Sequence, residues 1–484
     1  MKRRAFLTVA GGTLVALAGC SGDDDDGSET TPTATPTATP TPGVTPTETP
    51  AATPTETPEE TPTETPAEGE GPETTVEATE LLIESMAAGE FDRALEQFAP
   101  NAQRRISAGA LEAVWLALTN VGGPFQEIRE TEETTQSGFD AVDATLGFER
   151  GDHVLRVLLG DEFAPVGVVV NDEYEQPAYV DTDAFREEEI TLETDDCLMG
   201  ATVTVPEGGE DAPGVVLVHG SDPVGAADRN LEQLGSQVFR DLAEGLSTRG
   251  VAVLRYDRRT IACPNTVPPS EYTLDRVSVN DALFALDRIR SVDGVDTDRI
   301  GVVGHSLGGL AVPRILDRDE GLAAGIGMAA PARSFHEIFV DQYEHLATVG
   351  EFEWERMVNV YEQWRDRIDR IRQGDYSPGD TVLGYPGALW DSLDEYDHVA
   401  TARDVDQPIL FLQGERDYQV TVADDFQLWQ DELADRPDTE FQRYEGLNHL
   451  FQPGTGPSVP GEYAVRNSLD GAVVEDIAGF LGGL

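Results

Sequence analysis

Ser306 lies within a G-x-S-x-G segment, residues 304–308, between an apolar run and a stretch with helical periodicity. Glycines are needed there if the serine occupies a strained strand-to-helix turn, because a β-carbon at the flanking positions would collide with neighbouring backbone. Such a turn exposes the serine hydroxyl and aims the backbone N–H of Leu307, at a helix N-terminus, toward a developing oxyanion. The segment therefore predicts Ser306 as a nucleophile and Leu307 as an oxyanion-hole donor.

Attack by a serine also requires a base that takes the hydroxyl proton and a carboxylate that orients this base. His449 comes just after the last expected strand, and Asp417 comes just after an apolar strand at 409–412. Both positions are carboxyl ends of strands, the edge where ligands bind in open α/β sheets. The other histidines after Ser306 lie in a helical insertion: His336, His345 and His398. Three further acids near Asp417 remain open as alternatives to it: Asp404, Asp406 and Glu415.

The elements that must position these groups follow from the hydrophobic pattern between residue 189 and the C-terminus. Near-continuous apolar strands alternate there with helices, a pattern typical of a parallel sheet covered on both faces. Two strands at the start, 190–194 and 199–206, predict an opening antiparallel hairpin. The predicted fold class is therefore α/β, with a mostly parallel sheet.

A segment from about 331 to 405 interrupts the alternation, has no strand signal and is rich in aromatic residues. It predicts a helical cap that walls an acyl pocket and limits the access of water. Most of its aromatic side chains are expected to form the core of the cap itself. Trp390 is the one that we expect to contact substrate.

Four short segments, HGS at 219–221, GHSLGG at 304–309, GERD at 414–417 and LNH at 447–449, resemble motifs of the α/β-hydrolase family in order and spacing. The resemblance covers about residues 189–484 and is greatest to secreted esterases and dienelactone-hydrolase-like members. Those proteins show HGSGP and YDKRG where this chain has HGSDP and YDRRT. The resemblance implies a triad of Ser306, Asp417 and His449, no cofactor, and the N–H of Ser221 as the second oxyanion donor.

A smaller region, residues 73–185, precedes the hydrolase-like part. It begins with helical periodicity and continues with apolar runs that read as strands at 141–148, 153–159 and 165–170. The pattern predicts an α+β domain and resembles the small cone-shaped domain of the nuclear transport factor 2 type. It shows no catalytic constellation, and its lone histidine, His153, is expected to be structural or at the surface.

The first 20 residues read as an export signal, with Arg3-Arg4 resembling a twin-arginine motif and Leu17 to Cys20 resembling a lipobox. Cys20 is therefore the expected lipidation site, and we expect an extracytoplasmic protein anchored to the cell membrane by lipid. Residues 21–72 are an acid run followed by a Thr- and Pro-rich stretch, which predicts an extended disordered tether.

The chain carries 91 acidic residues against 33 Lys and Arg, a formal net charge of -58. Nucleic-acid binding through a basic face is excluded, because phosphate recognition needs clustered cations. Acids spread over periodic, apolar segments, with Lys2 as the only lysine, are typical of an extreme halophile, where high salt screens self-repulsion. The pattern predicts a halophilic, archaeal type of protein.

Two cysteines follow Cys20, namely Cys197 and Cys263. In an exported chain they favour a disulfide that closes a loop of about 66 residues. No H-x-H or C-x-x-C spacing suggests a metal site.

These observations predict a serine hydrolase that cleaves a small-molecule carboxylic ester through an acyl-enzyme. A thioesterase or an oligopeptidase could use the same triad. The alternative of another class is a non-catalytic surface binding protein on a hydrolase scaffold, which has no need of all three triad residues.

Overall fold

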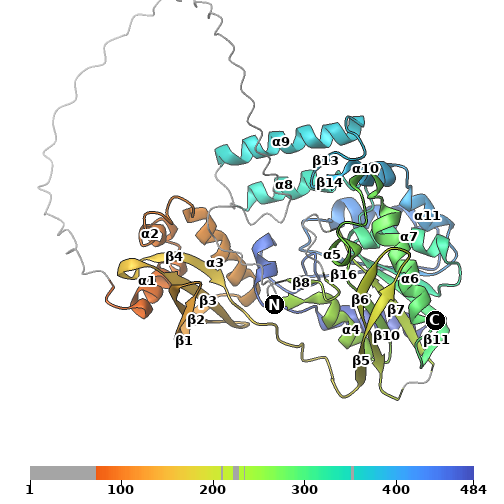
Figure 1. The fold of residues 1–484 in the computed structure, drawn as a ribbon, viewed down its shortest axis with the longest axis horizontal. Helices are drawn as coiled ribbons and strands as arrows, with labels where there is room; N and C mark the ends of the chain where they lie inside the picture. Colours follow the sequence, from red (N-terminus) through yellow and green to blue (C-terminus); the bar gives the residue numbers. More distant parts are fainter. Residues whose placement is uncertain (1–71, 209–210, 222–227, 234, 350–353) are drawn as a thin grey trace, which may run out of the picture. The chain divides into compact units, whose positions relative to one another are not determined.

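The computed structural model describes residues 72–208, 211–221, 228–233, 235–349 and 354–484 (Figure 1). These residues form one unit built around two main sheets. The predicted signal with Cys20, and the predicted tether except for its residue 72, lie outside the described residues. In the part of the chain that the structure describes, no helix combines the length and the apolar character needed to cross a membrane.

The first part of this unit, residues 72–170, packs three helices against a four-stranded antiparallel sheet in the order β1-β2-β3-β4. The elements are α1 (Thr75–Ala87), α2 (Phe91–Glu96), α3 (Ala108–Gly122), β1 (Phe125–Gln136), β2 (Phe139–Phe148), β3 (Gly151–Leu159) and β4 (Pro165–Val170). Thr74 and Ser107 begin α1 and α3, since each side-chain oxygen accepts a hydrogen bond from a backbone N–H of the first turn. Apolar side chains from the helices and the sheet share one buried core.

Strand β1 was not predicted by periodicity. Its sequence, FQEIRETEETTQ, is polar on both faces and shows no apolar alternation. It is a strand because it pairs with β2 from Phe125, opposite Phe148, to Gln136, opposite Phe139. As the edge strand of its sheet, it carries the charged side chains that discourage pairing with another chain.

The second sheet has eight strands in the order β16-β15-β12-β11-β7-β10-β6-β5. The strands are β5 (Phe185–Glu193), β6 (Leu198–Pro206), β7 (Ala212–Val218), β10 (Ala252–Tyr256), β11 (Val295–His305), β12 (Ala324–Met328), β15 (Ile409–Gly414) and β16 (Thr439–Tyr444). Pairings from β16 to β10 are parallel, whereas β6 pairs antiparallel with both β10 and β5. The predicted mostly parallel α/β sheet is confirmed.

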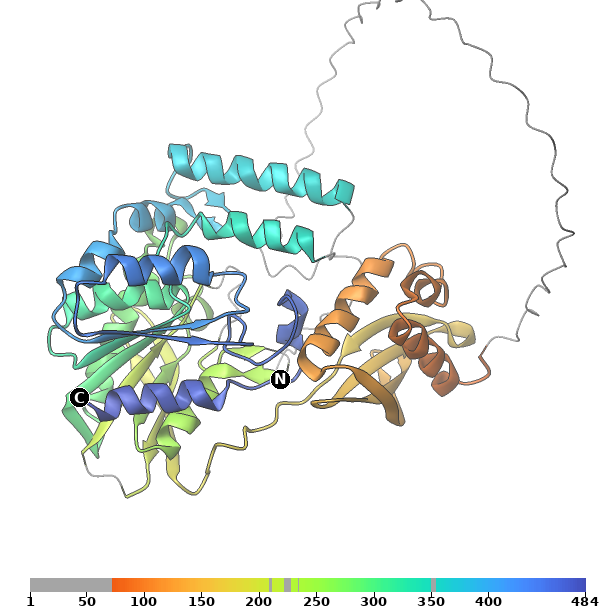
Figure 2. The ribbon, with the colours of Figure 1, turned by 180° about the vertical axis from the view of Figure 1, so that it is seen from behind.

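Helices cover both faces of this sheet (Figures 1 and 2). Val215 and Leu217 of β7 point into a core shared with α4 (Val238–Thr248) and α13 (Gly471–Gly482). Val216 and Val218 point into the opposite core, which α6 (Asn280–Ile289) and α7 (Leu307–Arg318) share. The alternation follows from the two-residue period of a strand, and burial on both faces explains why the strands are apolar throughout.

The cap lies between β12 and β15 and consists mainly of helices: α8 (Ile338–Thr348), α9 (Trp354–Gln373), α10 (Gly387–Asp394) and α11 (His398–Asp404). Helices α8 and α9 lie side by side in both views (Figures 1 and 2). A short antiparallel pair, β13 (Thr381–Val382) with β14 (Tyr385–Pro386), lies within a segment where no strand was predicted. Two residues per strand are too few to leave a periodic signal.

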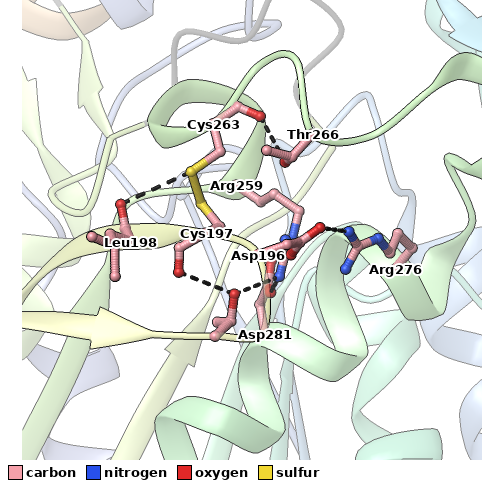
Figure 3. The surroundings of a disulfide bond; sticks show 9 residues. Asp196, Cys197, Leu198, Arg259, Cys263, Thr266, Arg276 and Asp281 are labelled. Carbon is pink, nitrogen blue, oxygen red and sulfur yellow. Dashed lines mark hydrogen bonds and ion pairs between the residues drawn. A yellow bond between two sulfur atoms is a disulfide. The ribbon is translucent and has the colours of Figure 1, made fainter.

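A disulfide joins Cys197, just before β6, to Cys263, just after the short helix α5 (Arg259–Ala262), with the two Cα atoms 5.9 Å apart. Beside it the buried guanidinium of Arg259 forms ion pairs with Asp281 and Asp196 (Figure 3). The covalent bond and the ion pairs together connect the turn between β5 and β6 to α5 and α6.

Candidate active site

Ser306 occupies the turn between β11 and α7 with a φ of 54°, in the left-handed region that a non-glycine residue rarely adopts. Its backbone N–H donates to the carbonyl of Met328 at 2.8 Å, which fixes the turn to the end of β12. A β-carbon on Gly304 would lie 2.2 Å from the oxygen of Gly308, and one on Gly308 would lie 2.4 Å from the oxygen of Val218. Both glycines are therefore required by the close approach of backbone to backbone.

The HGS segment lies against this turn because β7 and β11 are neighbouring parallel strands, with Val218 in register with Gly304. A β-carbon on Gly220 would lie 2.9 Å from the Cβ of Ser306. The strand order reverses here, with β10 and β11 on opposite sides of β7, and ligands bind at such switch points in α/β sheets. Ser221 thus follows directly after a residue in contact with Ser306, and Leu307 begins α7.

Arg258 holds the HGS segment from the other side. Arg258 is 4% exposed, and its Nη1 donates to the carbonyl of Gly220. Burial, reinforced by the positive charge of Arg258, lowers the pKa of His219 to about 3. His219 is therefore a neutral imidazole, and its Nε2–H donates to the carbonyl of Asp228 at 2.9 Å. This histidine supports the loop and is unsuited to take a proton.

Asp417 lies just past β15 and is 5% exposed. One carboxylate oxygen, Oδ1, accepts the backbone N–H groups of Gln419 at 2.8 Å and Val420 at 3.0 Å. The other, Oδ2, accepts the side-chain amide of Gln413 at 2.9 Å and Nδ1 of His449 at 2.7 Å. Four donors therefore fix the orientation of this carboxylate.

His449 follows β16 on a buried loop, and its Nδ1–H donates to Asp417, which leaves Nε2 unprotonated and able to act as a base. Its backbone carbonyl accepts Nε2–H of His305 at 2.8 Å, and the two rings lie 4.7 Å apart. Burial and the nearby His449 lower the pKa of His305 to about 3, so His305 is neutral. Because His305 directly precedes Ser306, this contact brings the His449 loop to the nucleophile turn.

A family model described as the alpha/beta hydrolase family matches residues 215–464, more than half of the chain. The chain belongs to the alpha/beta hydrolase family. This hydrolase is 32% identical over 404 residues to Esterase EstD of Thermotoga maritima, a match that covers 82% of the chain and 93% of EstD.

Solved structures also match, at lower identity. An esterase of Pyrococcus furiosus is 16% identical with a TM-score of 0.40, and the match covers 65% of this hydrolase and 97% of that chain. Est1E from Butyrivibrio proteoclasticus is 18% identical with a TM-score of 0.39, and covers 61% of this hydrolase and 98% of that chain.

The alternative acids and histidines of this hydrolase lie elsewhere. Asp404, Asp406 and Glu415 are exposed. His345 and His398 bind the backbone carbonyls of Ser458 and Ala332, and His336 pairs with Glu337. The N-terminal His153 is buried and pairs with Asp172, as a structural histidine does. Asp222, which stands where the family has glycine, lies outside the described residues.

Trp390 is 2% exposed and packs against the rings of Phe335, Phe339 and Tyr385. Its indole N–H donates to the carbonyl of Val382 at 3.0 Å. These contacts give Trp390 a packing role in the cap, and its contact with substrate stays a prediction. Among the described residues, no group of three or more His, Cys, Asp or Glu side chains is arranged to hold a metal ion.

Three polar residues around the site were not singled out from the sequence: Arg258, Gln413 and Glu462. Arg258 and Glu462 form hydrogen bonds with segments distant in the chain, and Gln413 forms one with the nearby side chain of Asp417. No sequence motif indicates such contacts. Of the three, Arg258 was the easiest to find from the sequence, because it lies in the YDRRT segment, which corresponds to YDKRG in the family.

Proposed function

We propose that this protein hydrolyses carboxylic esters through an acyl-enzyme intermediate on Ser306. The observation that carries the proposal is the buried pair of Asp417 and His449, 2.7 Å apart, together with the hydrogen bond that joins the His449 backbone to His305, the residue that precedes Ser306. A relative that is 32% identical over most of the chain is named an esterase, which supports an ester as the substrate.

In the proposed reaction, Nε2 of His449 takes the hydroxyl proton as Ser306 Oγ attacks the ester carbonyl. The backbone N–H groups of Leu307 and Ser221 donate to the oxyanion of the tetrahedral intermediate. His449 then gives its proton to the leaving alcohol, and the acyl group remains on Ser306. A water molecule, deprotonated by His449, attacks this acyl-enzyme, and collapse of the second intermediate restores the serine and releases the acid. Asp417 holds the imidazole in the required tautomer throughout and stabilises its protonated form.

The experiment that tests the proposal is turnover of p-nitrophenyl esters from acetate to dodecanoate in molar KCl, for wild type and Ser306→Ala. Loss of the nucleophile should reduce the rate by several orders of magnitude. Folded wild type that is inactive on every ester, and whose Ser306 is not labelled by a fluorophosphonate, would contradict the proposal. Activity on thioesters or peptides alone would assign the same triad to a thioesterase or an oligopeptidase, and binding without turnover would favour a non-catalytic binding protein.

We also propose that the hydrolase is exported and held at the outer face of the cell membrane by lipid on Cys20. The proposal is supported by the paired arginines, the short apolar run and the lipobox-like segment of the first 20 residues. Wild type should partition into the detergent phase of a Triton X-114 extraction and Cys20→Ser into the aqueous phase. Equal partitioning of the two would contradict the anchor.

A further inference from the structure

The segment from Val459 to Val465, near the C-terminus, joins the core of the N-terminal part. Val459 and Val465 are fully buried and belong to the hydrophobic cluster formed by α1, α2, α3 and the first sheet. Between them, a β-carbon on Gly461 would lie 2.9 Å from the Cβ of Ala117 in α3. The hydrolase chain and the N-terminal part are therefore connected by continuous apolar packing.

Glu462, in the middle of this segment, is completely buried and accepts hydrogen bonds from both sides. Its Oε1 accepts Nδ2 of Asn120, in α3, at 2.9 Å and Nη2 of Arg416 at 2.7 Å. Its Oε2 accepts Nδ2 of Asn448 at 3.3 Å. Arg416 directly precedes Asp417 and Asn448 directly precedes His449, so one carboxylate contacts both loops that carry the acid and the base.

Asn120 binds the same region at two further points. Its Nδ2 also donates to the backbone carbonyl of Pro457 at 2.8 Å. The backbone carbonyl of Asn120 accepts the N–H of Thr455 at 2.9 Å. Arg416 binds the adjacent carbonyl of Gly456 at 2.8 Å through Nε. The residues after His449 are thus held between α3 on one side and the Asp417 loop on the other.

We propose that the N-terminal part supports the active site, with Asn120 and Glu462 as positioning residues that fix the loops of Asp417 and His449. The proposal rests on the proposed function. Catalysis by a triad depends on the alignment of its members to within a fraction of an ångström, and misplacement by about 1 Å can cost roughly 100-fold in rate. Loss of the Glu462 carboxylate removes the one group that accepts hydrogen bonds from both Arg416 and Asn448, and so removes this connection between the two loops.

The test compares full-length Asn120→Ala, Asn120→Asp and Glu462→Gln with wild type in molar KCl, with rates normalised to active sites titrated by a fluorophosphonate. We expect kcat to fall by roughly 10- to 100-fold while KM changes little, because the carboxylate of Glu462 contacts the residues that directly precede Asp417 and His449. Asn120→Asp should be the most impaired, because it places a second carboxylate against Glu462 and the Pro457 carbonyl.

Val157→Ala, in the core of the first sheet, is the matched control for a merely structural role. It should lower the melting temperature to a similar extent and leave kcat unchanged. If Glu462→Gln does not fold, the two Asn120 variants decide the test. Asn120 variants with wild-type kcat, or a Val157→Ala variant with an equal loss of kcat, would overturn the inference. Inactive wild type, in contrast, would refute the proposed function.

Discussion

Arg258 donates a hydrogen bond to the carbonyl oxygen of Gly220, and both partners are buried beside the nucleophile turn. This carbonyl belongs to the same peptide group as the N–H of Ser221. Because a peptide group is planar and trans, its C=O and N–H point in opposite directions, and fixing one fixes the other. The guanidinium therefore determines where the Ser221 N–H points, and polarises the peptide so that this N–H becomes a stronger donor.

Arg258→Met should lower kcat by roughly 10- to 100-fold with little change in KM, less than the roughly 100- to 1000-fold cost of losing an oxyanion donor outright. Affinity for a trifluoromethyl ketone, whose adduct with the serine carries an oxyanion, should fall by a similar factor. Arg249→Met, at the far end of α4, is the control and should behave as wild type. Full activity of Arg258→Met would show that Ser221 needs no such support.

Asp417→Asn should reduce kcat by about 10,000-fold. The new amide would donate to Nδ1 of His449 and leave the proton on Nε2, the tautomer that cannot accept a proton from Ser306. Glu415→Gln is the matched control, because Glu415 lies two residues away but is exposed. Steady-state turnover of a short p-nitrophenyl ester measures both variants. A loss in Glu415→Gln instead would reassign the orienting acid.

Asp241, in α4, should make stability depend on pH. Burial is the main reason that its pKa is raised from 3.8 to about 7, although its carboxylate accepts Tyr174 Oη–H at 2.8 Å and the N–H of Leu469 at 3.1 Å. Between these two pH values the folded protein holds a proton that the unfolded chain has lost. Stability from this group is therefore complete below about pH 4 and falls by about 1.4 kcal/mol per pH unit up to about pH 7.

The measurement for Asp241 is the melting temperature from pH 5 to pH 8 in molar KCl. Relative to wild type, Asp241→Asn should gain stability as the pH rises to about 7 and should gain no more above it, because the variant has no carboxyl to deprotonate. The melting temperature of Asp140→Asn, a change at an exposed site in β2, should depend on pH as that of wild type does. Parallel curves for Asp241→Asn and wild type would contradict the raised pKa.

The disulfide between Cys197 and Cys263 should contribute about 4 kcal/mol to stability, because it closes a loop of 66 residues in the unfolded chain. The double variant Cys197→Ala/Cys263→Ala should melt at a lower temperature than wild type, and dithiothreitol should lower the melting temperature of wild type only. A thiol assay on unfolded protein checks the pairing: two reactive thiols before reduction would show that the bond does not form.

The net charge of -58 predicts a strong dependence of stability on salt. The Debye length shortens from about 10 Å at 0.1 M to about 3 Å at 1 M, so repulsion among exposed acids should fall steeply over this range. The melting temperature should rise with KCl between these concentrations, and by more than it rises with sucrose at equal osmolality, because sucrose stabilises by exclusion from the surface but does not screen charge. A melting temperature that is the same in low and molar KCl would rule out a halophilic adaptation.

The turn that carries Ser306 could be predicted from the sequence because local steric constraints determine which residues it accepts. The glycines around Ser306 mark a turn that only glycine permits, because backbone oxygens approach Gly304 and Gly308 too closely to leave room for a β-carbon. The alternation of apolar strands with helices likewise predicts a parallel sheet, since strands covered on both faces must be apolar throughout. Strand β1 escaped prediction because it is stabilised by pairing with β2 rather than by a buried face of its own.

Short segments of the sequence were enough to predict the chemistry, because they contain the nucleophile turn, the chain order of serine, acid and base, and the strand ends that carry them. The contacts that hold these groups in place became visible only in the folded chain. These contacts are hydrogen bonds that side chains form once the chain is folded: from Arg258 to Gly220, from Gln413 to Asp417 and from Asn120 to Glu462. Asn120 and Glu462 are 342 positions apart, and a buried hydrogen bond over such a separation exists only once two packed layers bring donor and acceptor together.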